Sequence, residues 1–180
     1  MPLARLAFRV LLVLLVLLIG IGLLLPASAT IERSVLIQAT PEEVFPHING
    51  MRAFHAWSPW AATDAATEYS FSGPEQGVGS RMEWRSGGTQ AGQGSQEIVA
   101  SVAPRQVEMR LVFGDKGGGT AQFRLQPEGL GTRVEWRFHS AFGWDLFSRY
   151  VGLMLDGMIG SAYERGLETL RQRVEAQAQT

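Results

Sequence analysis

The chain has 180 residues, enough for one domain with an anchor or tail and too few for two ordinary domains. Its 16 basic and 17 acidic residues are well mixed and leave a net charge of −1, so no cationic surface for nucleic acid is expected. Cysteine is absent, and the three histidines, His47, His55 and His139, are not spaced as a metal pair, so neither a metal nor a cofactor is expected.

The N-terminal segment is strongly apolar. From Val10 to Leu25 every residue is apolar or glycine, and no charged residue occurs between Arg9 and Glu32. A helix of that uncharged length reaches about 33 Å at ~1.5 Å per residue, which is enough to cross a hydrocarbon core of ~30 Å. We therefore expect residues 1–29 to form an anchor or signal segment that enters the membrane through residues 10–25.

Basic residues flank this segment on one side only. Arg5 and Arg9 precede the apolar run, and this bias predicts a cytoplasmic N-terminus and a domain at the outer face of a bacterial inner membrane. The alternative is cleavage after Ala29, because Ala27-Ser28-Ala29 has the small-x-small form of a signal peptidase site. The run of 16 apolar residues exceeds the usual signal-peptide length of ~7–15, which favours a retained anchor over a secreted or periplasmic domain.

The next residues predict a strand and two short helices. Residues 31–39 have the composition of a strand, and Thr40-Pro41-Glu42-Glu43 has the N-cap, first-turn proline and third-position glutamate of a helix start. A short helix through Ile48 is expected to end at Asn49-Gly50. A second short helical segment should carry Phe54, His55, Trp57 and Trp60.

Beyond Thr67 the hydrophobic period changes to two, which is typical of half-buried strands. Apolar side chains alternate with charged ones in several runs, and glycine clusters at residues 87–88, 117–119 and 129–131 are expected to form turns between them. Residues 98–102 fit a less regular strand. The pattern predicts a mostly antiparallel sheet with one apolar face. The alternating apolar sets begin at Val78, Val107, Ala121 and Val134.

A long helix is predicted from Trp144 to about Glu175 by apolar residues at three- and four-residue steps. This helix and the apolar sheet face are the only large apolar surfaces that need to be buried, so each should cover the other. Three glycines, Gly152, Gly157 and Gly160, each cost about 0.8–1 kcal/mol against alanine in a helix interior. They indicate either room for a ligand or close packing against the sheet.

This order of elements resembles the helix-grip fold of the SRPBCC (START/Bet v 1-like) superfamily. The chain is similar to membrane-anchored bacterial members of its polyketide cyclase/dehydrase and lipid-transport branch. The resemblance implies an α+β domain over residues 30–176, with a curved antiparallel sheet of about seven strands around the C-terminal helix and two short helices after the first strand. Residues 177–180 are expected to form a disordered tail. The resembling stretches are IERSVLIQATPEEVF (31–45), WSPWAA (57–62), FSGPEQGVGSRMEW (71–84), GTRVEWRF (131–138) and LDGMIGSAYERGLETL (155–170).

The expected function is binding or transfer of a hydrophobic small molecule or lipid in a cavity between sheet and helix. Methionine and tryptophan suit such a cavity because they fill irregular apolar spaces, although the same residues could form a closed core. The expected ligand-binding residues are Trp57, Trp60, Met82, Trp84, Phe113, Trp136, Met154 and Met158.

Two alternatives stay open. One is a cyclase or dehydratase in which Asp156 or His55 moves a proton, although no Ser/His/Asp set can be assembled from the spacing. The other is a membrane-associated accessory protein that binds a protein partner through the charged sheet face.

Overall fold

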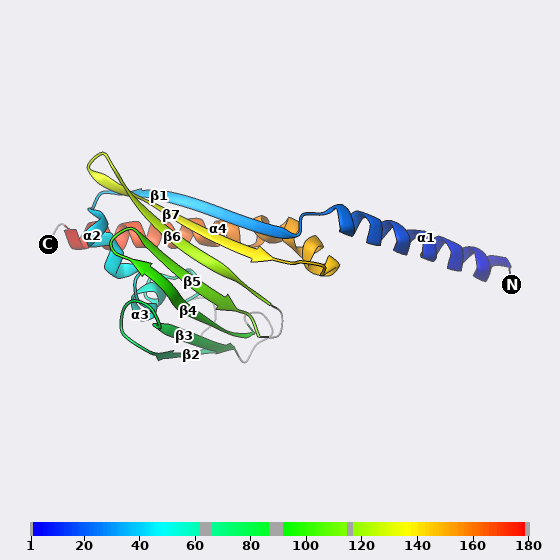
Figure 1. Cartoon of the computed structure of the whole chain (residues 1–180), viewed down its shortest axis with the longest axis horizontal. Coiled ribbons are helices and arrows are strands. Elements are labelled where there is room, and N and C mark those ends of the chain that lie inside the picture. The colour runs from blue at the N-terminus through cyan, green and yellow to red at the C-terminus, as the bar shows by residue number, and fades with distance from the viewer. Residues whose placement is uncertain (1, 62–65, 87–91, 115–116, 179–180) are drawn as a thin grey trace.

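The computed structural model describes residues 2–61, 66–86, 92–114 and 117–178. A long N-terminal helix projects from a globular part built of one sheet and several helices (Figure 1). The helices are α1 (Pro2–Leu24), α2 (Pro41–Val44), the 3-10 turn η1 (Phe45–His47), α3 (Met51–His55) and α4 (Leu146–Ala178). The strands are β1 (Ser28–Ile37), β2 (Thr67–Ser72), β3 (Arg81–Ser86), β4 (Gln93–Val102), β5 (Gln106–Val112), β6 (Gly118–Glu128) and β7 (Gly131–Ala141).

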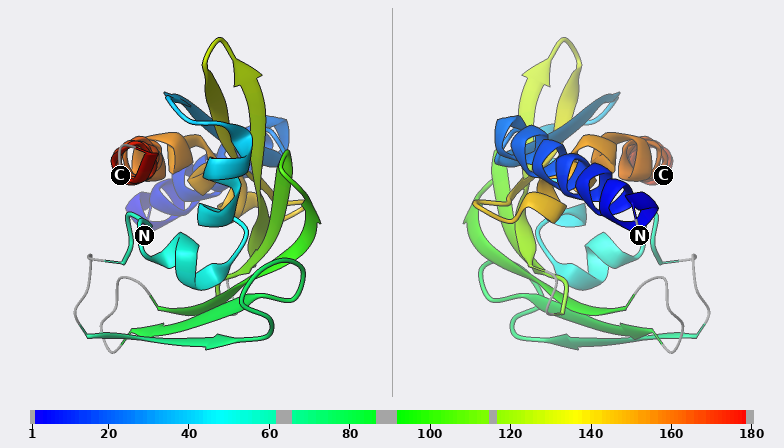
Figure 2. Two further views of the ribbon diagram at one scale, coloured as in Figure 1. Left: turned by 90° about the vertical axis from the view of Figure 1, so that its left-hand side faces the viewer. Right: turned by 90° about the vertical axis from the view of Figure 1, so that its right-hand side faces the viewer.

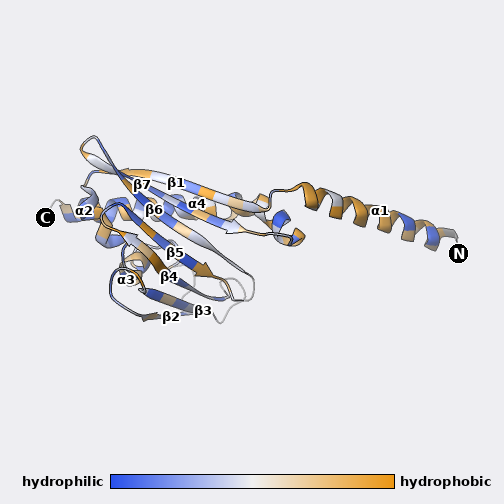
Figure 3. Cartoon of the chain, in the orientation of Figure 1, coloured by the Kyte–Doolittle hydropathy of each residue, from blue (hydrophilic) through white to orange (hydrophobic). Residues whose placement is uncertain are grey.

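Helix α1 is apolar over its whole circumference and is almost entirely exposed. Within it, residues Leu3–Leu24 have a mean hydropathy of 2.8 and the length and composition to cross a membrane. Figure 3 shows the concentration of apolar residues along α1 compared with the mixed surface of the globular part. The predicted apolar helix is therefore confirmed, and Gly22 is its one buried residue among those whose burial is described.

The strands form one antiparallel sheet in the order β1-β7-β6-β5-β4-β3-β2. The sheet curves around the short helices on its inner face, and α4 runs along the side of β1 and β7 (Figure 2). Strands β1 and β2 are the two edges, and α4 packs mainly on β1. The predicted α+β helix-grip fold is thus confirmed.

The start of α2 follows its sequence signal. The first four backbone N–H groups of an α-helix have no partner within the helix. At α2 the N–H of the N-cap residue Thr40 donates to the Glu43 carboxylate at 2.7 Å, which satisfies one of them. This bond lowers the pKa of Glu43, because it stabilises the charged carboxylate.

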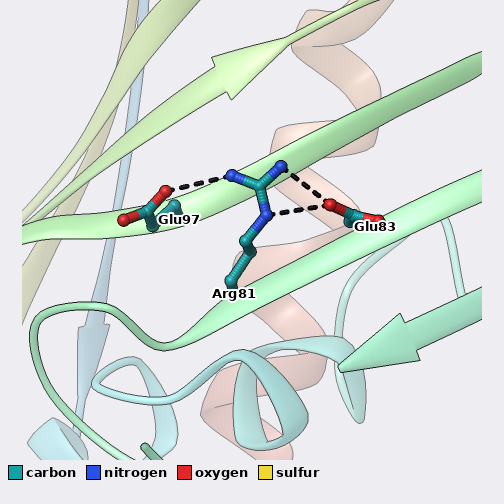
Figure 4. A network of polar contacts seen from close by, with 3 residues as sticks. All are labelled: Arg81, Glu83 and Glu97. Atoms are coloured by element: carbon teal, nitrogen blue, oxygen red, sulfur yellow. Dashed lines mark hydrogen bonds and ion pairs between the residues drawn. The ribbon is translucent and has the colours of Figure 1, made fainter. Parts of the chain in front are cut away.

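The outer sheet face carries the charged residues that alternate with the core. Arg81 contacts Glu83 at 2.8 Å and Glu97 at 3.1 Å across β3 and β4 (Figure 4). Exposed ion pairs of this kind contribute little stability each, about 0–1 kcal/mol. They keep the outer face hydrated and leave the inner face to form the core.

Several boundaries differ from those expected. β1 begins at Ser28, two residues before the expected domain start, and β3 begins at Arg81 because Gly77 and Gly79 adopt positive φ angles of 84° and 89°. Val78 therefore lies in a loop and is exposed. The irregular strand is confirmed as part of β4, whose register shifts between Ile98 and Ala100.

The predicted tail and one predicted turn are only partly covered by the structure. Helix α4 continues to Ala178, two residues beyond the expected domain end. Residues 179–180 and the expected turn at residues 87–88 lie outside the described residues.

Two glycines in α4 occupy opposite environments and give a matched stability test. A Cβ at Gly157 would contact nothing within 4 Å, whereas a Cβ at Gly166 would lie 2.9 Å from Pro59 Cδ and 3.0 Å from Trp136 Cζ3. Gly157→Ala should raise the free energy of unfolding by ~0.5–1 kcal/mol, through helix propensity alone. Gly166→Ala should lower it or leave it unchanged. Denaturant unfolding of the full chain in detergent measures both, and an equal gain from the two substitutions would contradict this packing.

Candidate functional site

The inner face of the sheet carries a row of three aromatic rings, which we call the aromatic row: Trp84 on β3, Phe113 directly after β5, and Phe138 on β7. The ring centroids of Trp84 and Phe113 are 6.0 Å apart, and those of Phe113 and Phe138 are 6.4 Å apart. Phe138 is buried, Trp84 is half-buried and Phe113 is 38% exposed. The row is therefore an apolar surface that the fold covers only in part.

Glycines beneath the aromatic row allow two of its rings to lie flat on the sheet. A Cβ at Gly94 would come within 2.2 Å of the Trp84 indole, and a Cβ at Gly119 within 2.5 Å of the Phe138 ring. Any larger residue at either position would push the ring above it off the sheet. The glycines thus set the height of the apolar surface.

Strand register places the aromatic row at the end of the sheet that is joined to α1. Ser28 and Ala141 pair where β1 begins and β7 ends, and the N–H of Phe142 donates to the carbonyl of Ala27 at 2.7 Å. Following the pairing from β7 across β6, β5 and β4 leads to Gly94, which pairs with Trp84 at this same end.

The opposite half of the inner face is a filled core. Trp57 and Trp136 are 2% and 0% exposed and meet edge to face, with ring centroids 5.5 Å apart. Tyr163 of α4 stacks on Trp136 at 3.8 Å, and its burial raises the pKa of its hydroxyl. Phe54 and Phe123 complete this aromatic cluster.

A hollow between α3, β2 and β3 measures about 40 Å³ and is lined by Met51, Arg52 and Phe71, among others. Ligand pockets usually measure ~300–1,000 Å³, so this hollow has room for water but not for a lipid. The half-covered aromatic row is the better candidate site.

The structure separates the predicted ligand-binding residues into four groups, and their role in binding stays a prediction. Trp57, Trp136 and Met82 are buried core residues. Trp60 is 37% exposed and contacts Trp136 and Tyr163 edge to face, so it lies between core and surface. Trp84 and Phe113 lie together in the aromatic row, and Met154 and Met158 are exposed on α4.

Met154 and Met158 do not face the filled core because α4 presents a different side to it. Apart from Arg149, the buried residues of α4 run from Gly160 onward, whereas Met154 and Met158 are 66% and 61% exposed on the N-terminal half. The apolar period of α4 is thus continuous in sequence, but in its N-terminal half Leu155 and Ile159 pack against the core and the two methionines do not.

Asp156 lies in an ion-pair network at the β1 edge of the sheet rather than among apolar side chains. The Arg33 guanidinium contacts Asp156 at 2.9 Å and Glu164 at 2.8 Å, which raises the pKa of Arg33. A Cβ at Gly160 would lie 2.3 Å from Arg33 Nη2, so this glycine lets the guanidinium pass across α4 between its two carboxylate partners. Both carboxylates are more than 60% exposed.

His55 lies at the other edge of the sheet. Its ring centroid is 4.3 Å from that of Tyr69 and 5.6 Å from that of Phe71, both on β2. Burial lowers the pKa of His55, which keeps the imidazole neutral near pH 7. Because β1 and β2 are opposite edges, Asp156 and His55 are not brought together.

Arg149 is the residue that the sequence pattern did not single out. Its guanidinium is buried and donates to the carbonyls of Leu23 at 3.1 Å and Leu25 at 3.2 Å, at the C-terminal end of α1. It also donates to the Gly143 carbonyl at 2.6 Å. A cation at a helix C-terminus satisfies orphan carbonyls and complements the helix dipole. The available signal was an arginine within an otherwise apolar stretch of the amphipathic helix.

A curved antiparallel sheet around a long C-terminal helix, with an aromatic inner face, places the protein in the helix-grip class. Residues 28–175 match the family described as polyketide cyclase/dehydrase and lipid transport, and the chain belongs to this family, of the SRPBCC type. No curated protein matches the sequence.

Solved structures show the same fold at low sequence identity. The di-domain ARO/CYC StfQ from the steffimycin biosynthetic pathway is 9% identical with a TM-score of 0.62, covering 86% of this chain and 53% of that chain. Protein SA2116 of unknown function from Staphylococcus aureus is 12% identical with a TM-score of 0.62, covering 85% and 97%. The Aha1 dimer from Colwellia psychrerythraea is 18% identical with a TM-score of 0.54, covering 82% and 96%.

The two part-buried histidines predict a pH dependence of stability. Burial lowers the pKa of His47 and His55 below the usual 6.5, with Arg173 adding to the effect at His47. Below pH 6.5 the folded state therefore binds fewer protons than the unfolded state. The contribution of the two histidines to the free energy of unfolding is full above that pH and is lost as pH falls through their pKa values in the folded state.

We expect the free energy of unfolding to decline between pH 6.5 and about 5, before the carboxylates titrate. A variant carrying His47→Asn and His55→Gln should show a flatter profile over this range. Denaturant unfolding at a series of pH values measures it, and identical slopes for the two proteins would disprove the assignment.

Proposed function

We propose that the protein binds a hydrophobic small molecule or lipid on the aromatic row and exchanges it with an adjacent membrane. The observation that carries this proposal is the position of Trp84 and Phe113, which are partly exposed at the sheet end joined to α1. An apolar ligand leaving the bilayer there would meet the least covered aromatic surface of the inner face. The family description, which includes lipid transport, supports the same role.

The driving force would be desolvation of apolar surface on both sides of the contact. Aromatic side chains each bury about 150–250 Å² when fully covered, and the gain is roughly 25 cal/mol per Å² of apolar surface removed from water. The half-covered rings retain part of that area for a ligand. Since the hollow between α3, β2 and β3 is too small for a lipid, the ligand would lie over the rings rather than inside that hollow.

Helix α1 would hold this site at the outer face of the inner membrane. Arg5 and Arg9 before the span favour a cytoplasmic N-terminus.

Retention of α1 is favoured over cleavage by two contacts. Ser28 and Ala29, in the small-residue motif, are paired with β7, and Arg149 binds the carbonyls at the end of α1. Cleavage after Ala29 would remove both contacts.

A catalytic role as a cyclase or dehydratase is the second candidate, and His55 is the observation that favours it. A neutral imidazole near pH 7 can accept a proton, and the His55 ring lies against the aromatic side chains of Tyr69 and Phe71 on β2. Asp156 is less suited to proton transfer because it is paired with Arg33 at 2.9 Å at the exposed edge of the sheet.

Native mass spectrometry of the full chain, released from its own membrane in mild detergent, tests binding. We expect a co-purifying apolar compound, and Trp84→Ala or Phe113→Ala should reduce its affinity by about ten-fold or more, ~1.4 kcal/mol. Leu130→Ala is the matched control, since Leu130 is 97% exposed in the turn between β6 and β7, at the far end of the sheet from α1. Equal occupancy in all four proteins would refute the proposed site.

The same preparation separates a carrier from an enzyme. A carrier releases the co-purified compound unchanged, whereas an enzyme converts it and loses about 10²–10⁴ in rate when its proton-transfer residue is replaced. We expect no conversion by the wild type. A product that disappears in His55→Gln or Asp156→Asn would establish the cyclase or dehydratase instead.

A further inference from the structure

The first turns of α4 lie directly against the end of α1. A Cβ at Gly22 would lie 3.1 Å from the Tyr150 ring and 3.5 Å from Leu146 Cβ, so the absence of a side chain at Gly22 permits this approach. The Tyr150 hydroxyl donates to the Leu18 carbonyl at 2.5 Å. Together with the Arg149 bonds, these contacts fix the N-terminal end of α4 alongside the last two turns of α1.

This position sets the depth of α4 relative to a membrane that α1 crosses. Leu18 precedes the end of α1 at Leu24 by six residues, or about 9 Å at ~1.5 Å per residue. The polar zone on each side of a bilayer is only about 5–8 Å thick. A residue that contacts α1 between Leu18 and Gly22 therefore lies within about 9 Å of the level at which α1 ends, in the outermost part of the hydrocarbon core or in the headgroup zone.

The side chains at this level that do not face α1 are large, apolar and exposed. Trp144 is 83% exposed and Phe147 is 76% exposed. The exposed apolar stripe continues along α4 through Met154 and Met158, at the helical spacing of one face. In Figure 1 the start of α4 lies beside the junction of α1 and β1.

From these contacts we propose that residues 144–147 insert into the outer interfacial zone of the lipid bilayer, as a second membrane contact beside α1. The inference rests on the proposed membrane anchoring of α1. Tryptophan suits this zone because the ring is apolar and the indole N–H stays hydrated. Asp145 caps the first turn of α4 by accepting from the Ser148 backbone N–H at 3.2 Å, and it also accepts from the Ser148 hydroxyl at 2.6 Å. It limits the depth because a carboxylate stays at headgroup level.

The chemistry of the surface specifies the lipid property that it recognises. Its exposed side chains are apolar, and the nearby Arg149 cation is buried against backbone carbonyls. Binding should therefore depend on the hydrocarbon boundary and not on anionic headgroups. Such binding would hold the globular domain in a fixed orientation, with the aromatic-row end of its sheet toward the membrane.

The absence of cysteine makes single-cysteine labelling of the full chain possible. The variants are Trp144→Cys, Phe147→Cys, Met154→Cys, Leu14→Cys within α1, and Leu130→Cys at the far hairpin. Each carries a bimane label in phosphatidylcholine nanodiscs, with and without phosphatidylglycerol. Quenching by spin-labelled lipids and by aqueous iodide is then compared.

We expect lipid quenching at residues 144 and 147 to reach about half of that at residue 14, to be weaker at residue 154 and to be absent at residue 130, independently of phosphatidylglycerol. Lipid quenching at residue 14 combined with iodide quenching alone at residues 144 and 147 would overturn this inference and leave the anchor intact. Protection of residues 144 and 147 from both quenchers would also overturn it, because a protein partner would then cover the surface. No lipid quenching at residue 14 would refute the anchor itself.

Discussion

The Arg149 guanidinium joins the two parts of the molecule, and the functional account depends on it. It donates to carbonyls at the end of α1 and to Gly143 in the turn that leads into α4. A buried arginine is stable only when its N–H groups are satisfied, and a helix C-terminus supplies carbonyls that need donors. Arg149 thereby gives donors to the carbonyls that end α1 and acquires acceptors for its own N–H groups. As a consequence, the direction of α1 is coupled to the end of the sheet that carries the aromatic row.

The inner face of the sheet divides into a sealed half and a half-covered half. In the sealed half, Tyr163 of α4 stacks on Trp136 and excludes water. In the other half, α4 turns its methionines outward, and the sheet is covered by rings that lie flat on Gly94 and Gly119. The same helix therefore stabilises the fold chiefly with its C-terminal half, and in its N-terminal half it leaves Phe147, Met154 and Met158 exposed.

The fold was predictable because local patterns and the global architecture agree. Thr40 and Glu43 mark a helix start, the period-two runs mark the strands, and the apolar stripe marks α4. The site was less predictable, because periodicity identifies a face but not its partner. Met154 continues the stripe yet is exposed, and Asp156 has apolar neighbours in sequence but an arginine from β1 in space. The role of Arg149 depends on α1, more than 120 residues earlier in the chain.

Photo-crosslinking tests most directly the central claim that an apolar compound from the membrane reaches the aromatic row. Cells would incorporate a diazirine-bearing fatty acid into their lipids, and crosslinked peptides of the full chain would be mapped after illumination. We expect crosslinks within residues 82–86 and 111–113, in addition to those on α1. Crosslinks confined to α1 and the first turn of α4, with none on the inner face of the sheet, would contradict the account.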